Sequence, residues 1–316
     1  MKKKFLLLLL AVMVMLSLAA CGDKSDGTQD SQAAAGSETS PNAQETYPNA
    51  DLLTEAEWVQ AHAKDSNIVI VDVRSKGYEQ GHIPGAVSLK SGLLKDGDHN
   101  TVVGADKFQE LVQNAGINSD TTVVLYDDGN SLSSGRVFYV LEYYGHKDKV
   151  KVLNGGYAAW MAASMDVSTD APTPAKGNFV ATADDKLLTT KEEIKLLDLE
   201  ACTLLDVRSA DEYSGADLRG NKKGGHIESA VNKDWTESID NETSDGVPKF
   251  KPYKQLQEEY SAVGLDKDKT IIPYCQTNVR GAQSYFTLRL LGYKDVRPYE
   301  GSFAEWGNAD DTEVVS

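Results

Sequence analysis

Runs of four or five apolar residues recur along the chain, separated by longer stretches in which the apolar residues follow a helical period. The runs lie at 68–71, 123–126, 204–207 and 271–274, and Asp206 is the one charged residue within them. A strand with one face in water alternates polar and apolar residues, so these almost uniformly apolar runs indicate strands that are buried on both faces. Strands alternating with helices predict an α/β fold, in which each mainly parallel sheet is covered by helices on both faces.

The two halves of the chain repeat one another. The matching segments are 68–89 with 202–232 and 121–160 with 269–306. The second copy differs chiefly by the inserted stretch "ADLRGNKKGG", which precedes His226. A repeat of this length is one folding unit, so the sequence predicts two tandem α/β domains, at 51–170 and 181–316.

The first residues of the chain have the form of an export signal. Residues 1–20 combine a basic start, an apolar run and small residues before Cys21, and "LSLAAC" resembles the lipobox of bacterial lipoproteins. This resemblance implies that Cys21 becomes the lipid-modified first residue of the mature protein. Residues 21–50 are polar and have little to bury, which predicts a disordered tether. We therefore expect an extracytoplasmic protein, lipid-anchored to the bacterial cell membrane; an ordinary secretory signal with a chance cysteine is the alternative.

The charge of the chain narrows the choice of partners. The formal net charge is −16 at pH 7, and no basic stretch outside the leader offsets it. A surface this acidic repels phosphate backbones, so we do not expect nucleic acid as a partner. We also expect neither a metal nor a cofactor.

Cys275 is the candidate for the catalytic nucleophile. It follows the apolar run 271–274 and precedes a stretch of helical pattern. In parallel sheets, ligands bind beyond the carboxyl ends of the strands, and a turn from strand into helix directs backbone N–H groups at a bound anion. A thiol placed there has its nucleophilic thiolate stabilised. A lone cysteine at a strand end is otherwise a small buried apolar residue, but the polar loop after Cys275 favours the nucleophile.

The conjunction of motifs resembles one known family. Paired "DVRS...EY...GHI.GAV" motifs, a strand ending in cysteine and the closing "GYK.V..Y.G...EW" are similar to the tandem-domain rhodaneses, the thiosulfate and mercaptopyruvate sulfurtransferases, from about residue 51 to residue 307. The resemblance implies an inactive N-terminal domain and a catalytic C-terminal domain. It also implies that Cys275 takes a sulfane sulfur from thiosulfate, mercaptopyruvate or polysulfide as a persulfide. The acceptor would be a thiol, cyanide or a thioredoxin-like protein. The alternative is a lipoprotein that binds sulfur or a redox partner without turnover.

Substrate-binding residues are expected in the loop after the cysteine. They are Gln276, Thr277, Asn278, Val279 and Arg280. Relatives that act on phosphate resemble cysteine phosphatases, whose loop between cysteine and arginine is one residue longer, so this loop suits a sulfur atom better. Arg280 either binds an anionic donor or is a solvated or salt-bridged residue.

Two further residues, Arg208 and Glu212, are candidates for donor binding. Arg208 and its neighbour Asp206 recur as Arg74 and Asp72 in the copy without the cysteine, which favours a structural pair. Glu212 stands where the well-known thiosulfate and mercaptopyruvate enzymes carry a basic residue, so we expect it to disfavour dianionic donors.

The remaining residues of interest are Asp127 and Cys202. Asp127 aligns with Cys275, and because a carboxylate cannot accept a sulfane sulfur, the N-terminal domain is expected to be a scaffold. Cys202 falls toward the opposite end of its strand, too far from Cys275 for a disulfide.

Overall fold

The computed structural model describes residues 46–97 and 101–316. The predicted signal peptide (1–20), Cys21 and most of the predicted tether (21–50) lie outside the described residues. Within residues 46–97 and 101–316, no helix combines the length and the apolar character that crossing a membrane requires.

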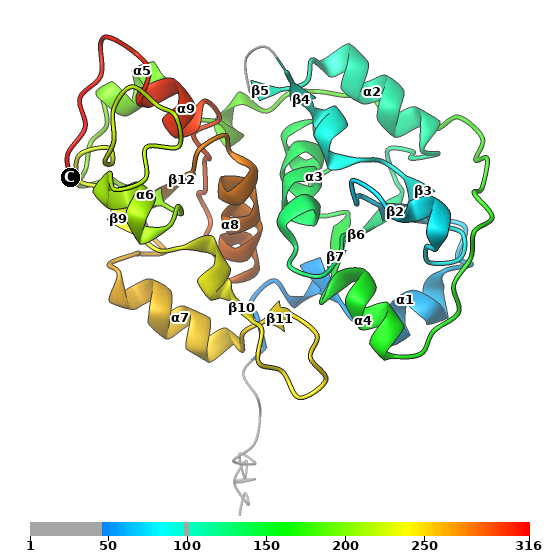
Figure 1. Ribbon diagram of the computed structural model, residues 1–316. Helices are drawn as coiled ribbons and strands as arrows, with labels where there is room; N and C mark the ends of the chain where they lie inside the picture. Colours follow the sequence, from blue (N-terminus) through cyan, green and yellow to red (C-terminus); the bar gives the residue numbers. More distant parts are fainter. Residues whose placement is uncertain (1–45, 98–100) are drawn as a thin grey trace, which may run out of the picture. The chain divides into compact units, whose positions relative to one another are not determined.

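The N-terminal repeat is built on one parallel sheet (Figure 1). Its strand order is β1-β7-β6-β2-β3. The strands are β1 (Leu53–Thr54), β2 (Ile68–Asp72), β3 (Val87–Ser88), β6 (Thr122–Tyr126) and β7 (Val150–Leu153). The helices are α1 (Ala56–His62), α2 (Ala105–Asn114), α3 (Leu132–Tyr143) and α4 (Gly156–Ala162). Residues of α1 and α4 share one core cluster with the sheet, and residues of α2 and α3 share another, so helices cover both faces.

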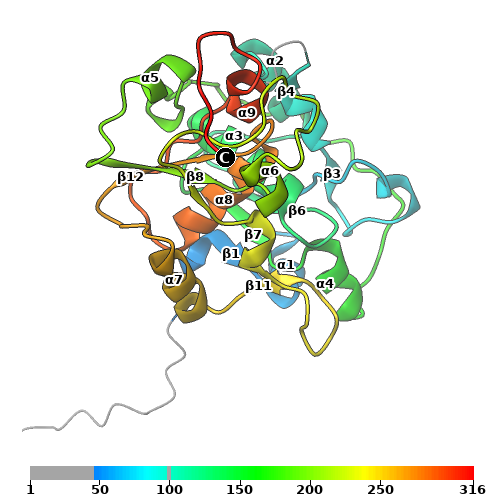
Figure 2. The same ribbon diagram turned by 60° about the vertical axis from the view of Figure 1, so that its left-hand side comes forward.

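The C-terminal repeat has the same design. Three parallel strands, in the order β12-β8-β9, form its sheet. Single parallel bridges, Ile271 with Val296 and Thr189 with Tyr299, extend the sheet beyond β12. The strands and helices are β8 (Cys202–Asp206), β9 (Val231–Asn232), β12 (Thr270–Tyr274), α5 (Lys191–Lys195), α6 (Ala210–Ser214), α7 (Tyr253–Ala262), α8 (Val279–Leu290) and α9 (Ser302–Trp306). Figure 2 shows α5 and α9 on one side of β8 and β12, and α7 on the other.

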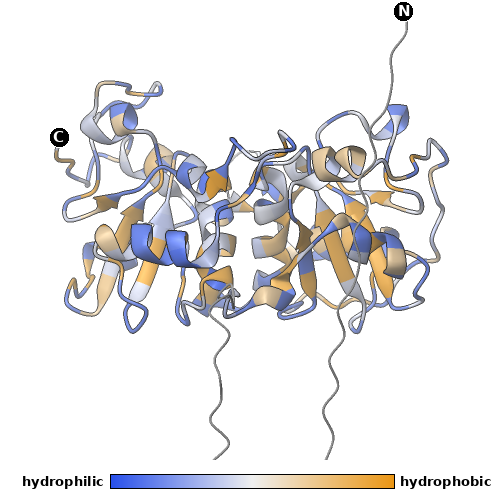
Figure 3. Ribbon diagram, turned by 90° about the horizontal axis from the view of Figure 1, so that it is seen from below, coloured by the Kyte–Doolittle hydropathy of each residue, from blue (hydrophilic) through white to orange (hydrophobic). Residues whose placement is uncertain are grey.

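Short elements lie outside the two sheets. They are the antiparallel pairs β4 (Lys95–Asp96) with β5 (Thr101–Val102) and β10 (Ile239–Asp240) with β11 (Lys249–Phe250), and the 3-10 helices η1 (Ala50–Leu52), η2 (Tyr78–Gln80), η3 (Ser91–Leu94), η4 (Asp185–Leu187) and η5 (Trp235–Ser238). The apolar runs of the sequence are β2, β6, β8 and β12, and Figure 3 shows these apolar strands in the interior of each repeat. The predicted α/β fold is confirmed.

Helices α3 and α8 pack against one another and join the two repeats (Figure 1). They approach so closely that a Cβ atom on Gly135 would lie 2.6 Å from the Cα atom of Gln283, so only glycine fits there. Ion pairs cross the same boundary: Arg289 Nη2 lies 3.0 Å from Glu142 Oε1, and Arg136 pairs with Glu300. Apolar residues of both repeats share one core cluster, so the repeats are packed as a unit.

The first described residues do not behave as the tether predicted up to residue 50. Asn49 Nδ2 donates a 2.6 Å hydrogen bond to the carbonyl of Arg289. The ring of Tyr47 contacts that of Tyr253 edge-on, with centroids 5.8 Å apart, and its hydroxyl donates to the carbonyl of Lys251. Tyr47 and Asn49 therefore contact the C-terminal repeat. The polar composition of the segment gives no sign of these contacts.

Candidate active site

Cys275 lies immediately beyond the carboxyl end of β12, where the sequence predicted it. Its side chain is 1% exposed. Its backbone N–H donates to Ser302 Oγ at 3.3 Å, and its carbonyl accepts from the N–H of Phe303 at 2.9 Å. Both partners belong to α9, so this helix fixes the strand end that carries the thiol. The loop then turns sharply into α8 through Asn278, whose φ of 52° is left-handed.

The equivalent turn of the N-terminal repeat shows what this local structure binds. Asp127 follows β6 as Cys275 follows β12. Its buried carboxylate accepts hydrogen bonds of 3.0–3.2 Å from the backbone N–H groups of Gly129, Ser131, Ser133 and Ser134. Burial raises the pKa of Asp127, and the four N–H donors oppose that rise. The strand–loop–helix turn of this fold therefore cradles an anion, and in the C-terminal repeat a thiol stands at the start of that turn.

Arg280 is both salt-bridged and close to the thiol. It makes a bidentate ion pair with Glu212, with Nη1–Oε2 at 2.6 Å and Nη2–Oε1 at 2.8 Å. Burial lowers the pKa of Arg280, but Glu212 and Cys275 together raise it above the ordinary value. Burial likewise raises the pKa of Glu212, and the pairing with Arg280 outweighs it, so the pKa lies below the usual value. The Arg280 charge thus faces Cys275 while a carboxylate holds it in place.

The ion pair with Arg280 alters the effect expected of Glu212 on anionic donors. Its side chain is buried, and it also closes a capping box with Ser209 at the start of α6. The positive charge of Arg280 compensates the carboxylate of Glu212. Glu212 is therefore not the uncompensated negative charge that would disfavour dianionic donors. Sequence singled out both residues, but nothing in the pattern indicated that they pair across 68 positions.

Glu212→Gln is expected to lower the free energy of unfolding at about pH 7 by roughly 1–3 kcal/mol, because Arg280 loses its charged partner. Since the folded-state pKa of Glu212 lies below the ordinary 4.5, this contribution is complete above that pH and is lost as pH falls through the folded-state pKa. Urea unfolding of both proteins at a series of pH values, from about pH 7 downward through the acid range, measures the effect. Glu110→Gln, in an exposed pair, is the control. A difference that does not shrink at any pH at which the wild type is still folded would contradict the assignment.

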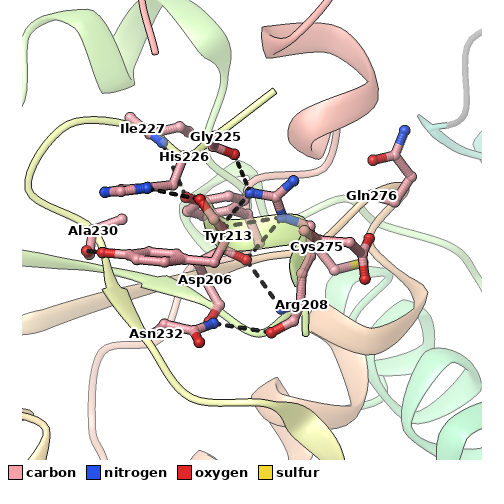
Figure 4. Close-up of polar contacts among 12 residues, drawn as sticks. Asp206, Arg208, Tyr213, Gly225, His226, Ile227, Ala230, Asn232, Cys275 and Gln276 are labelled. Carbon is pink, nitrogen blue, oxygen red and sulfur yellow. Dashed lines mark hydrogen bonds and ion pairs between the residues drawn. The ribbon is translucent and has the colours of Figure 1, made fainter. Parts of the chain in front are cut away.

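Arg208 is occupied by structural contacts. Its Nη2 lies 2.6 Å from Asp206 Oδ2 and donates a 2.7 Å hydrogen bond to the carbonyl of Gly225 (Figure 4). Arg74 and Asp72 pair in the same way in the N-terminal repeat, at 2.5 Å. The guanidinium of Arg208 is 1% exposed. Its donors brace the strand end against a neighbouring loop in both repeats, which favours the structural interpretation over contact with a donor.

The loop side chains divide between structural contacts and the surface. Gln276 exchanges two amide hydrogen bonds with Asn221, of 2.8 and 3.1 Å, which ties the loop to the inserted segment of the second repeat. Asn278 is buried and donates to Glu300 Oε2 at 2.5 Å. Thr277 and Val279 are partly exposed, and Val279 begins α8. Of the five predicted loop residues, two thus orient the loop through their side chains.

Two cations that sequence reasoning missed contact this loop from the N-terminal repeat. Lys95 Nζ donates to the carbonyl of Thr277 at 3.1 Å, and Arg136 Nη1 donates to that of Asn278 at 3.3 Å. Their separations of 182 and 142 positions leave no local sequence signal. The single hint is that Arg136 directly precedes the apolar run 137–141 of a helical stretch, and an arginine in such a position is buried only when it is paired.

The second cysteine of the described residues, Cys202, lies away from the site. Cys202 is in register with Thr270, at the opposite end of the paired strands from Cys275. Both cysteines are free, as predicted, although Cys202 is partly exposed and not fully buried. Within the described ranges, no group of three or more His, Cys, Asp or Glu side chains is placed to hold a metal ion.

Comparison with known proteins identifies the family. Residues 55–163 and 189–309 each match the model of the rhodanese-like domain. The chain belongs to the rhodanese family. This rhodanese is 33% identical over 284 residues to the sulfur carrier protein TtuD of Thermus thermophilus, an alignment that covers 83% of this chain and 95% of that protein. It is 34% identical over 281 residues to the thiosulfate sulfurtransferase of Corynebacterium glutamicum, covering 84% and 90%.

A solved structure shares the fold. The anaerobic ergothioneine biosynthesis enzyme from Chlorobium limicola, in complex with trimethyl histidine, superposes with a TM-score of 0.75 at 23% identity, covering 85% of this chain and 71% of that chain. The tandem rhodanese predicted from the motifs is thereby confirmed as a relative of the thiosulfate sulfurtransferases.

Proposed function

We propose that this rhodanese is a sulfurtransferase that moves a sulfane sulfur through a persulfide on Cys275. The observation that carries the proposal is the position of the thiol. It stands at the start of a turn whose counterpart in the same chain holds the carboxylate of Asp127 with four backbone N–H groups. The positive charge of Arg280 adjoins it. Relatives at 33–34% identity bear the names of a sulfur carrier and a thiosulfate sulfurtransferase.

The chemistry has two displacement steps. With thiosulfate as donor, the Cys275 thiolate attacks the outer sulfur, the S–S bond of the donor breaks, and sulfite leaves with the electron pair of that bond. The terminal sulfur of the resulting persulfide carries the negative charge, which the loop N–H groups and Arg280 stabilise. An acceptor thiolate or cyanide then attacks the outer sulfur and displaces the Cys275 thiolate. No oxidant or reductant is consumed, and the cysteine returns to its starting state.

A specific observation favours the second candidate, a sulfur carrier. The identity to a protein named as a sulfur carrier is nearly the same as the identity to a named sulfurtransferase, 33% against 34%. A carrier takes up one sulfur and passes it to a protein, for which a thioredoxin-like partner is the candidate, without repeated turnover on small acceptors.

Turnover separates the two candidates. The protein is incubated with excess thiosulfate and cyanide, and the thiocyanate formed per chain is counted. We expect many equivalents from the wild-type chain and none above background from Cys275→Ser. One equivalent that appears only in the first cycle supports the carrier, and the absence of any sulfur uptake contradicts both.

We also propose that Cys21 carries a lipid anchor. Support comes from the lipobox-like residues before it and the polar stretch after it; Cys21 itself lies outside the described residues. Lipid attachment to the membrane resists high salt, whereas electrostatic adsorption does not. We expect Cys21→Ala to move the protein from the salt-washed membrane fraction to the soluble extracytoplasmic fraction. If the variant remains with the washed membranes, the lipid assignment is wrong.

A further inference from the structure

The N-terminal repeat holds the catalytic loop by two of its backbone carbonyls. Lys95, on β4, donates to the carbonyl of Thr277, and Arg136, on α3, donates to the carbonyl of Asn278. Arg136 is 1% exposed, and its charge is balanced by Glu300 of the C-terminal repeat. Lys95 is partly exposed, so it can be replaced at less risk to the fold than Arg136.

These contacts decide which way the loop N–H groups face. In a planar trans peptide the carbonyl and the following N–H point in opposite directions. With the carbonyl of Thr277 directed at Lys95, the N–H of Asn278 points away from Lys95. With the carbonyl of Asn278 directed at Arg136, the N–H of Val279 points away from Arg136. A cation on a carbonyl also polarises the peptide and strengthens its N–H as a donor.

The N-terminal repeat shows where such an N–H group points. Ser131 is the cap residue of α3, as Asn278 is of α8, and both have left-handed φ angles, of 60° and 52°. The N–H of Ser131 donates at 3.2 Å to the carboxylate of Asp127, the residue at the position of Cys275. The turn of the C-terminal repeat is one residue shorter, with two residues between Cys275 and Asn278 against three between Asp127 and Ser131, so the correspondence is one of the helix caps. From that correspondence we expect the N–H of Asn278 to face the place where the thiolate or persulfide charge resides.

The charged groups around the loop shift one another's pKa values. Burial, and next the positive charge of Arg136, lower the pKa of Lys95, whereas Glu300 and Cys275 raise it. Burial lowers the pKa values of Arg136 and Arg280, whereas Glu300 raises the pKa of Arg136, Glu212 raises that of Arg280, and Cys275 adds to both rises. Lys95 and Arg136 contact the backbone of the loop, and Arg280 pairs with Glu212 beside it, so two of these three cations come from the repeat that lacks the cysteine.

We infer that Lys95 is a positioning residue through which the N-terminal repeat sets the preference of Cys275 for anionic reagents and donors. Lys95 acts through the Thr277–Asn278 peptide and through its charge, without touching the donor. The inference rests on the proposed function, because an anionic donor and a persulfide anion are the species that this arrangement favours. It also gives the N-terminal repeat a part in the chemistry beyond that of a scaffold.

A pair of alkylating reagents tests the inference without sulfur chemistry. Iodoacetate and iodoacetamide attack the same thiol with the same leaving group and differ by one negative charge. Rates at Cys275, followed by peptide mass, give an iodoacetate-to-iodoacetamide ratio for the wild type, Lys95→Met, Lys95→Arg and the exposed control Lys107→Met. We expect the ratio to fall about three- to tenfold in Lys95→Met and to stay within about twofold in the other two, with the fall shrinking as salt rises. An unchanged ratio in Lys95→Met, or a Lys95→Arg variant as poor as Lys95→Met, would overturn the inference.

Thiosulfate loading separates this inference from the proposed function. The Lys95→Met chain should still take up one sulfur at saturating thiosulfate, but with a raised KM and a folded-state stability close to that of the wild type. A wild-type chain that takes up no sulfur contradicts the proposed function, whatever the alkylation ratios. A chain that loads sulfur normally and shows the same ratio in all four proteins contradicts the inference alone.

Discussion

Cys275→Ser is expected to abolish sulfur loading, by at least about a hundredfold in rate, and to leave the fold intact. A serine hydroxyl does not ionise near neutral pH and cannot form a persulfide, so the nucleophile is lost outright. The fold should tolerate the change because the polar contacts of this residue with Ser302 and Phe303 are made by its backbone. Intact mass after incubation with thiosulfate measures loading, and thermal unfolding measures the fold.

Cys202→Ser is the matched control for that experiment. It removes the other cysteine of the described residues, at the far end of the same strand pair, and should load sulfur at the wild-type rate. If sulfur loading survives in Cys275→Ser and disappears in Cys202→Ser, Cys202 carries the sulfur and the assignment to Cys275 is wrong.

Glu300→Gln is expected to cause the largest loss of stability, about 3–5 kcal/mol in the free energy of unfolding. The pair it forms with Arg136 is almost fully buried, with the two side chains 1% and 2% exposed and Nη2–Oε1 at 2.6 Å. Removing the carboxylate charge leaves a guanidinium in the interior without its counter-charge, and the cost of desolvating that cation is then uncompensated. Urea unfolding at neutral pH measures the change.

The control for this prediction is Glu237→Gln, whose carboxylate pairs with Lys233 but is 55% exposed. It should change stability by less than about 1 kcal/mol. The double variant Arg136→Leu/Glu300→Leu should recover much of the loss, because no charge then remains buried. A Glu300→Gln variant within about 1 kcal/mol of the wild type would show that the pair does not hold the two repeats together as described.

The fold and the position of the thiol could be predicted because both follow from local patterns. Strands buried on both faces need uniformly apolar runs, and a helix beginning after a short polar loop fixes the turn that contains Cys275. The internal repeat allows a comparison within the chain. Arg74 and Asp72 recur in the repeat that lacks the cysteine, and this recurrence indicates that the pair of Arg208 with Asp206 is structural.

The electrostatic surroundings of the thiol could not be predicted in the same way. The sequence pattern makes Arg280 and Glu212 separate candidates, but their pairing depends on how α6 packs beside the loop, and no periodicity encodes that contact. Lys95 lies on a two-residue strand of the other repeat, where a lysine has the character of an ordinary surface residue. Contacts between repeats are set by the packing of α3 on α8, and no local pattern in either helix specifies that packing.

Isotope mapping shows whether Cys275 carries the transferred sulfur. Thiosulfate with a heavy isotope in its outer sulfur alone is incubated with the wild-type chain, which is then digested without reduction and examined by peptide mass. We expect one labelled sulfur on the peptide that contains Cys275, released quantitatively as labelled thiocyanate when cyanide is added. A label found on the Cys202 peptide, or a folded chain that acquires no label at Cys275, would contradict this expectation.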